Sequence, residues 1–141
     1  MEMNDIRRFY EEQGRDFERA LAEIRSGKKK THWIWYIFPQ LRALGRSRTA
    51  CYYGIADLAE AERYFADELL RSRLLEITKA LLDLPSQPPS WILGSVDSQK
   101  VFSCMTLFDA VAGEDYDAFR LVLDKFYDGK RDEATLQILN G

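Results

Sequence analysis

The residue with the clearest catalytic potential is His32, the only histidine in the chain, which stands between three lysines and the aromatic run Trp33–Phe38. An imidazole changes protonation near neutral pH, so His32 is the candidate general acid or base. No Asp, Glu or Cys stands at an interpretable spacing from it, and one histidine is not a catalytic motif. A histidine that only hydrogen-bonds within the fold is therefore the favoured interpretation.

A second group of candidates follows Pro39: Gln40, Arg42, Arg46 and Ser47. Arginine presents forked donors that match phosphate or carboxylate oxygens, and a helix beginning near Ser47 would add backbone N–H groups. The alternative is ordinary surface pairing of these cations with the acidic remainder of the domain, worth about 0–1 kcal/mol for each pair. The two interpretations carry about equal weight.

A third group, Lys100, Ser103 and Thr106, has the spacing i, i+3, i+6, which places the first two together on a helix. This polar stripe could meet the 42–47 loop and close an anion-binding cleft. Equally, the hydroxyls could bond to carbonyls of their own helix. One or two aromatic residues are also expected to reach this cleft. The predicted ligand-binding residues are therefore His32, Trp35, Gln40, Arg42, Arg46, Ser47, Tyr53, Lys100 and Ser103.

The charge pattern supports an anionic partner. The window from Ile24 to Ala56 contains no acid and seven basic residues, a formal charge of +7 in a chain whose total is −3. Subtracting the window leaves −10 for the remaining residues. Clustered charge of one sign concentrates ions of the opposite sign. The acidic remainder argues against a long nucleic-acid contact surface.

The 141 residues, 46% hydrophobic and 30% charged, have the size and composition of one globular domain spanning residues 1–141. No apolar run approaches the roughly 20 residues that cross a bilayer, and residues 1–8 have no apolar signal core, which favours a cytoplasmic location. Cys51 and Cys104 are expected to be inert thiols. Nothing in the sequence implies a metal or an organic cofactor.

Helical spacing of apolar residues dominates and predicts a compact all-α domain of about seven or eight mostly short helices. Residues 86–90, rich in Pro and Ser, are expected to form an interhelical loop. The expected helices are Ile6–Gln13 interrupted by Gly14, Phe17–Ile24 stopped by Gly27, Ser47–Tyr53, one capped by Asp57 with Glu60 as its capping-box partner, Leu69–Leu82, Asp97 up to Gly113, Tyr116 up to Gly129, and Asp132–Asn140.

The apolar run Trp33–Phe38 fits either a buried strand or a buried helical turn. No partner strand stands elsewhere in the sequence, and an unpaired buried strand would leave its backbone groups without hydrogen bonds. A short helix is therefore expected, with Thr31 as a possible N-cap and a break at Pro39.

Three blocks resemble a bacterial family of unknown function, the domain-of-unknown-function family numbered 1810. They are His32-Trp-Ile-Trp-Tyr-Ile-Phe-Pro-Gln-Leu-Arg42, the segment from Ser47 to Ala61, and Lys100 with Ser103-Cys-Met-Thr-Leu-Phe108. Cys104 and Asp67-Glu68 depart from the family pattern. The resemblance implies a small all-helical domain without an assigned activity. Members often carry the label calpastatin, a disordered inhibitor whose composition differs from that of this folded domain.

The functional hypothesis is binding, with hydrolysis as its catalytic extension, of a small anionic or phosphorylated, nucleotide-derived ligand. The expected site is a cleft between residues 32–47 and the 97–112 helix. A protein-interaction or nucleic-acid-binding module without catalysis is the alternative, and the former would expose Trp33 or Trp35. The sequence does not decide whether the chain is an enzyme, and it leaves the oligomeric state open.

Overall fold

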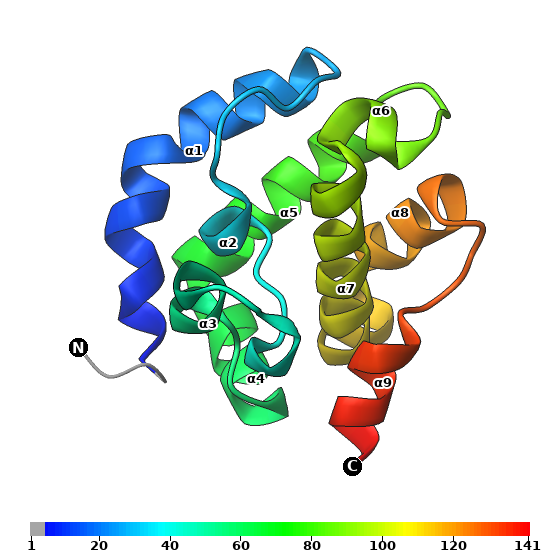
Figure 1. Ribbon diagram of the computed structural model, residues 1–141. Coiled ribbons are helices and arrows are strands. Elements are labelled where there is room, and N and C mark those ends of the chain that lie inside the picture. The colour runs from blue at the N-terminus through cyan, green and yellow to red at the C-terminus, as the bar shows by residue number, and fades with distance from the viewer. Residues whose placement is uncertain (1–4) are drawn as a thin grey trace.

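The computed structural model describes residues 5–141 and is 73% helical, which confirms the all-α prediction (Figure 1). Within these residues it contains nine α-helices and three short 3-10 helices. In chain order they are η1 (Ile6–Phe9), α1 (Tyr10–Arg25), α2 (Ile34–Ile37), η2 (Arg42–Leu44), α3 (Arg48–Tyr53), α4 (Leu58–Ala66), α5 (Glu68–Leu82), α6 (Pro89–Leu93), α7 (Ser95–Ala112), η3 (Gly113–Asp115), α8 (Ala118–Phe126) and α9 (Glu133–Asn140).

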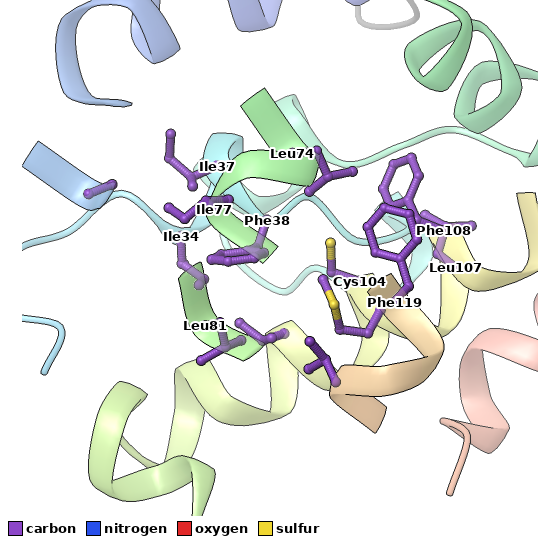
Figure 2. Packing of buried hydrophobic residues seen from close by; sticks show 14 of the residues in the cluster. Ile34, Ile37, Phe38, Leu74, Ile77, Leu81, Cys104, Leu107, Phe108 and Phe119 are labelled. Carbon is purple, nitrogen blue, oxygen red and sulfur yellow. The ribbon is translucent and has the colours of Figure 1, made fainter. Parts of the chain in front are cut away.

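The core forms where α5 and α7 pack against their neighbours. Helix α5 contacts α1, α4 and α8, and α7 contacts α4, α6, α8 and α9. Figure 1 shows α1 along one side of the molecule and α7 flanked by α8 and α9. In Figure 2, side chains from α2, α5, α7 and α8 meet in the interior, with Ile34 and Ile37 near Ile77 of α5 and with Phe108 near Phe119. The apolar stripes of separate helices thus share one core.

The aromatic run is mostly interior, as expected. Trp33 is fully buried, Tyr36 and Phe38 are buried, and Trp35 is half-buried. Helix α2 is a single turn that ends at Ile37, because Phe38 precedes Pro39 and adopts a non-helical backbone with φ −124° and ψ 72°.

Three local predictions are wrong. Gly14 does not interrupt a helix: α1 runs through it. Thr31 does not cap α2, because its hydroxyl donates to Glu23 and Trp33 occupies the N-cap position. The proline-rich segment is not all loop, since Pro89 begins the short helix α6. Proline is favourable at the first position of a helix because its missing N–H would have no intrahelical partner there.

Asp57 caps α4 as predicted, by accepting a hydrogen bond from the backbone N–H of Glu60. The reciprocal half of the capping box is absent. Glu60 instead accepts from the backbone N–H of Ala56 and from the buried guanidinium of Arg8. A distant cation therefore replaces the local partner that the capping box requires.

The segment between α2 and α3 is pinned to the segment that follows α3. The backbone N–H of Arg42 donates to Ile55 O at 2.7 Å, and the N–H of Ile55 donates to Gln40 O at 2.8 Å. Gly54 permits this close approach, because a Cβ atom there would lie 2.4 Å from Arg42 Cα. The two bonds hold residues 40–47 in place as one wall of a surface pocket.

No helix within residues 5–141 is long and apolar enough to cross a membrane.

Candidate functional site

A pocket of about 470 Å³ lies between one face of α7, the η2–α3 segment and the beginning of α9. Its volume is within the range of about 300–1,000 Å³ that is usual for small-molecule sites. The lining residues come from three separate parts of the sequence: Gln40, Leu44, Arg46, Ser47, Ala50, Val96, Gln99, Lys100, Ser103, Asp132 and Ala134.

Helical periodicity explains the contribution of α7. Val96, Gln99, Lys100 and Ser103 stand at i, i+3, i+4 and i+7, so they share one face of the helix. The opposite face is buried in the core, where Val101, Met105 and Phe108 have no exposed surface. The burial of one face thus fixes which residues α7 presents to the pocket.

Two cations line the pocket. Lys100 is oriented by Asp97 Oδ1, 4.0 Å from its Nζ, and by the Trp35 ring, whose centroid lies 5.6 Å from the same atom. Asp97 Oδ2 is closer to Lys29, at 2.9 Å, so the carboxylate is shared between two lysines. Arg46 is exposed and has no ion pair or hydrogen bond within residues 5–141. The Arg46 charge is therefore not paired with any acid of the described chain.

A carboxylate, Asp132, forms part of the pocket lining and is 7% exposed. The hydroxyls of Ser103 and Thr135 each donate to its Oδ2 atom at 2.6 Å, and its backbone N–H donates to Thr106 Oγ1 at 3.0 Å. Hydrogen bonds to a carboxylate from hydroxyls at this distance are of the strong, charge-assisted kind. Together they hold the side chain in one orientation.

Five of the nine predicted ligand-binding residues line this pocket: Gln40, Arg46, Ser47, Lys100 and Ser103. Trp35 lines a separate cavity of about 10 Å³, whose lining shares Gln40, Ala50 and Lys100 with the pocket. The Ser47 hydroxyl also caps α3, by accepting from the N–H of Ala50 at 3.0 Å. Ser103 and Thr106 additionally bond to carbonyls of their own helix, as the alternative interpretation of that stripe expected.

The other three predicted residues do not line the pocket. His32 is exposed and has no hydrogen-bond or ionic partner within residues 5–141. Arg42 donates from Nε to the carbonyl of Cys51 at 3.2 Å, beneath α3. Tyr53 packs against the rings of Tyr36 and Tyr52, with centroid distances of 5.2 and 4.8 Å. Burial, reinforced by the charge of Glu12, raises the pKa of Tyr53 to about 12.

The sequence interpretation overlooked Asp132, Gln99 and Val96. For the two α7 residues a signal was available, because they lie at helical spacing from Lys100 and Ser103. The sequence gives no such signal for Asp132, because an Asp before a helix is usually an N-cap. Its side chain makes no capping bond to α9 and turns to Ser103 and Thr135 instead.

Together these features define a small, single-domain, all-helical protein with a polar pocket at the junction of three chain segments. The chain belongs to the family described as "Protein of unknown function (DUF1810)", whose pattern matches residues 3–139. This confirms the resemblance in the sequence. The chain is also similar to a conserved hypothetical protein, Rv1873 from Mycobacterium tuberculosis, at 38% identity, with 97% of each chain covered and a TM-score of 0.92. No curated protein matches the chain.

Proposed function

We propose that this protein binds a small phosphorylated, nucleotide-derived molecule in the pocket between α7, η2–α3 and α9. The observation that carries the proposal is the convergence of Arg46 and Lys100 on one pocket of about 470 Å³. Arg46 has no anionic partner within residues 5–141, and Lys100 shares a single carboxylate with Lys29. A phosphate group would supply the missing negative charge and accept from both side chains.

The remaining lining fits the rest of a nucleotide. Leu44, Ala50, Val96 and Ala134 provide apolar surface, and Val96 is 68% exposed. Gln40 and Gln99 add amide groups that both donate and accept hydrogen bonds. Pockets of this kind, mostly apolar with a few convergent polar groups, are typical of small-molecule sites.

The geometry supports binding better than hydrolysis. His32, the candidate general base, does not line the pocket, and a general base must come within hydrogen-bond reach of the proton that it removes. The two rival functions also lose support. Trp33 is buried and Trp35 is half-buried, so neither is exposed as the protein-interaction alternative predicts. Two cations of the basic window, Arg25 and Lys29, are paired with Glu76 and Asp97.

The proposal is tested with adenosine 5′-monophosphate (AMP) at low salt. Calorimetry measures its affinity, and thermal unfolding measures the stabilisation that it produces. A ligand at about 100 times its Kd stabilises the native state by about 2.7 kcal/mol, so the Tm should rise by several degrees. Arg46→Ala and Lys100→Met should each weaken AMP binding about 10- to 100-fold, because each removes a charge-assisted hydrogen bond.

Arg48→Ala is the matched control, because Arg48 is an exposed arginine two residues from Arg46 that does not line the pocket. This variant should bind AMP as the wild type does. If AMP leaves the wild-type Tm unchanged, or if Arg48→Ala weakens binding as much as Arg46→Ala, the proposed pocket is wrong.

A further inference from the structure

The two oxygens of the Asp132 carboxylate differ in their hydrogen bonds. Its Oδ2 atom accepts hydrogen bonds from Ser103 and Thr135, while Oδ1 has no hydrogen-bond partner within residues 5–141. No cation of that part of the chain lies within 4.0 Å of either oxygen; neighbouring Arg131 is paired with Asp109 instead. A buried carboxylate normally has hydrogen-bond donors on both oxygens, and here residues 5–141 supply donors to Oδ2 alone.

The pocket is where such a donor would enter. Within residues 5–141, Thr78 Oγ1 is the one side-chain polar atom that is sealed from solvent without a partner, so Asp132 Oδ1 retains access to solvent. Asp132 as a whole is only 7% exposed and lines the pocket. Its free oxygen is therefore reached through the pocket, close to Ser103 and Lys100 on the adjacent face of α7.

The chemistry of the site favours a hydroxyl over a cationic group as the donor. A carboxylate only accepts hydrogen bonds, so its partner must carry an O–H or N–H group. Lys100 and Arg46 line the same pocket and repel a ligand ammonium group, and two hydroxyls already stabilise the Asp132 charge. A neutral hydroxyl on a molecule whose phosphate meets the cations satisfies all of these groups together.

We propose that Asp132 is the specificity-determining residue of the pocket and that its free oxygen accepts a hydrogen bond from a sugar hydroxyl of the phosphorylated ligand. The inference rests on the function proposed above and narrows it from phosphorylated molecules in general to those with a sugar hydroxyl. Ser103 and Thr135 are positioning residues, because they fix the Asp132 carboxylate and leave one oxygen for the ligand.

The test compares AMP with 2′,3′-dideoxyadenosine 5′-monophosphate by calorimetry, using the complete wild-type chain. The two probes share the phosphate and the base and differ only in the sugar hydroxyls. The wild type should bind AMP about tenfold more tightly or better, as expected for a hydrogen bond to a charged group. This comparison needs no mutation, so it does not depend on whether a variant folds.

Asp132→Ala then assigns the preference to a residue, because an amide, unlike a methyl group, would still hydrogen-bond to a sugar hydroxyl. It should bind both nucleotides with nearly equal affinity and should bind the dideoxy nucleotide at least as tightly as the wild type, since a negative charge has been removed. Glu133→Gln is the control, because Glu133 is exposed, adjacent in sequence and absent from the pocket lining. It should keep the tenfold preference.

The outcomes separate the two proposals. If the wild type binds both nucleotides equally, the role of Asp132 is wrong while the proposed pocket stands. A preference for AMP that survives in Asp132→Ala also overturns the inference. If neither nucleotide binds, the proposed function and the inference fail together.

Discussion

Glu23 is the residue on which the conformation of the basic segment depends. Its Oε1 accepts from the backbone N–H groups of Lys30 and Thr31 at 2.7 and 2.9 Å and from Trp33 Nε1 at 3.0 Å, and its Oε2 accepts from the Thr31 hydroxyl at 2.6 Å. Burial raises the pKa of Glu23, but these four hydrogen bonds lower it more, from the usual 4.5 to about 2. One carboxylate thereby orders residues 30–33.

Replacing Glu23 by Gln should destabilise the fold by about 2 kcal/mol at pH 7, because an amide cannot accept all four bonds and hydrogen bonds to a charged group are worth about 1.5–3 kcal/mol. A carboxyl whose pKa is lower in the folded state stabilises the fold above its unfolded pKa and loses that contribution as the pH falls. The difference in the free energy of unfolding between wild type and variant should thus shrink as the pH falls from 4.5 to 2. Urea unfolding at several pH values measures it.

Glu18→Gln is the control for this experiment, since Glu18 is an exposed carboxylate on the same helix. Its free energy of unfolding should stay within about 0.5 kcal/mol of the wild type. A difference between wild type and Glu23→Gln that does not change with pH would contradict the assigned role of the carboxylate.

The sequence predicts pocket residues whose type and local spacing indicate their chemistry. It does not predict residues whose role depends on partners distant in the sequence. Arg46 and Lys100 stand out as cations at interpretable positions, and both line the pocket. Glu23 and Asp132 resemble ordinary surface or capping acids until the fold brings Trp33 to one and Ser103 to the other. Tertiary contacts assign these roles, and sequence spacing carries no signal for them.

At the scale of elements, Gly14 should weaken α1 without serving a packing need. A methyl group there would lie 3.9 Å from Arg73 Nη2, an ordinary contact. Because glycine in a helix interior is destabilising by roughly 0.5–1 kcal/mol relative to alanine, Gly14→Ala should stabilise the protein by that amount. A thermal melt should show a Tm a few degrees higher.

Gly54→Ala provides the opposite case, because its methyl group would lie 2.4 Å from Arg42 Cα and 2.9 Å from Ala50 O. Overpacking of this kind typically destabilises by about 1–3 kcal/mol, so the Tm should fall. If both alanine variants shift the Tm in the same direction, the steric difference between the two glycines does not explain their roles.

The helices were predictable where local signals agree. The apolar spacing and flanking residues around 69–82 and 97–112 predicted α5 and α7 to within two residues of Glu68–Leu82 and Ser95–Ala112. Sequence and structure differ where a single residue type is the main signal. Gly14 by itself predicts a helix break, but the buried side chains of Gln13, Asp16 and Phe17 keep α1 continuous. Packing against the core outweighs the propensity of a single residue.

At the scale of the molecule, folding gives partners to part of the basic window. Arg25 lies 3.7 Å from Glu76, Lys29 lies 2.9 Å from Asp97, and Arg42 bonds to a backbone carbonyl. Of the seven cations, Arg46 alone lines the pocket, where Lys100 from outside the window joins it. Folding therefore gives three of these cations partners and brings Arg46 to the same pocket as Lys100, from a distant segment.

Long-range pairing also joins the N-terminal part of the described chain to α4 and to the end of α3. The Arg8 guanidinium donates to both Glu60 oxygens at 2.9 Å and to the carbonyls of Tyr52 and Gly54 at 2.8 Å, and neither charged side chain is exposed. Removing one partner from a buried ion pair leaves an uncompensated charge, which is destabilising by about 3–5 kcal/mol. Arg8→Met should therefore lower the free energy of unfolding by about that amount in urea titrations.

A double-mutant cycle distinguishes this buried pair from general damage to the fold. Glu60→Gln in the Arg8→Met background removes the unpaired charge but keeps an oxygen that can accept from the N–H of Ala56. The double variant should then be less destabilised than the sum of the two single variants, because residues in one network couple. Arg7→Ala, at a side chain that is 69% exposed, should leave the unfolding midpoint unchanged. Strict additivity would mean that Arg8 supports the fold through its packing and backbone bonds, independently of the Glu60 charge.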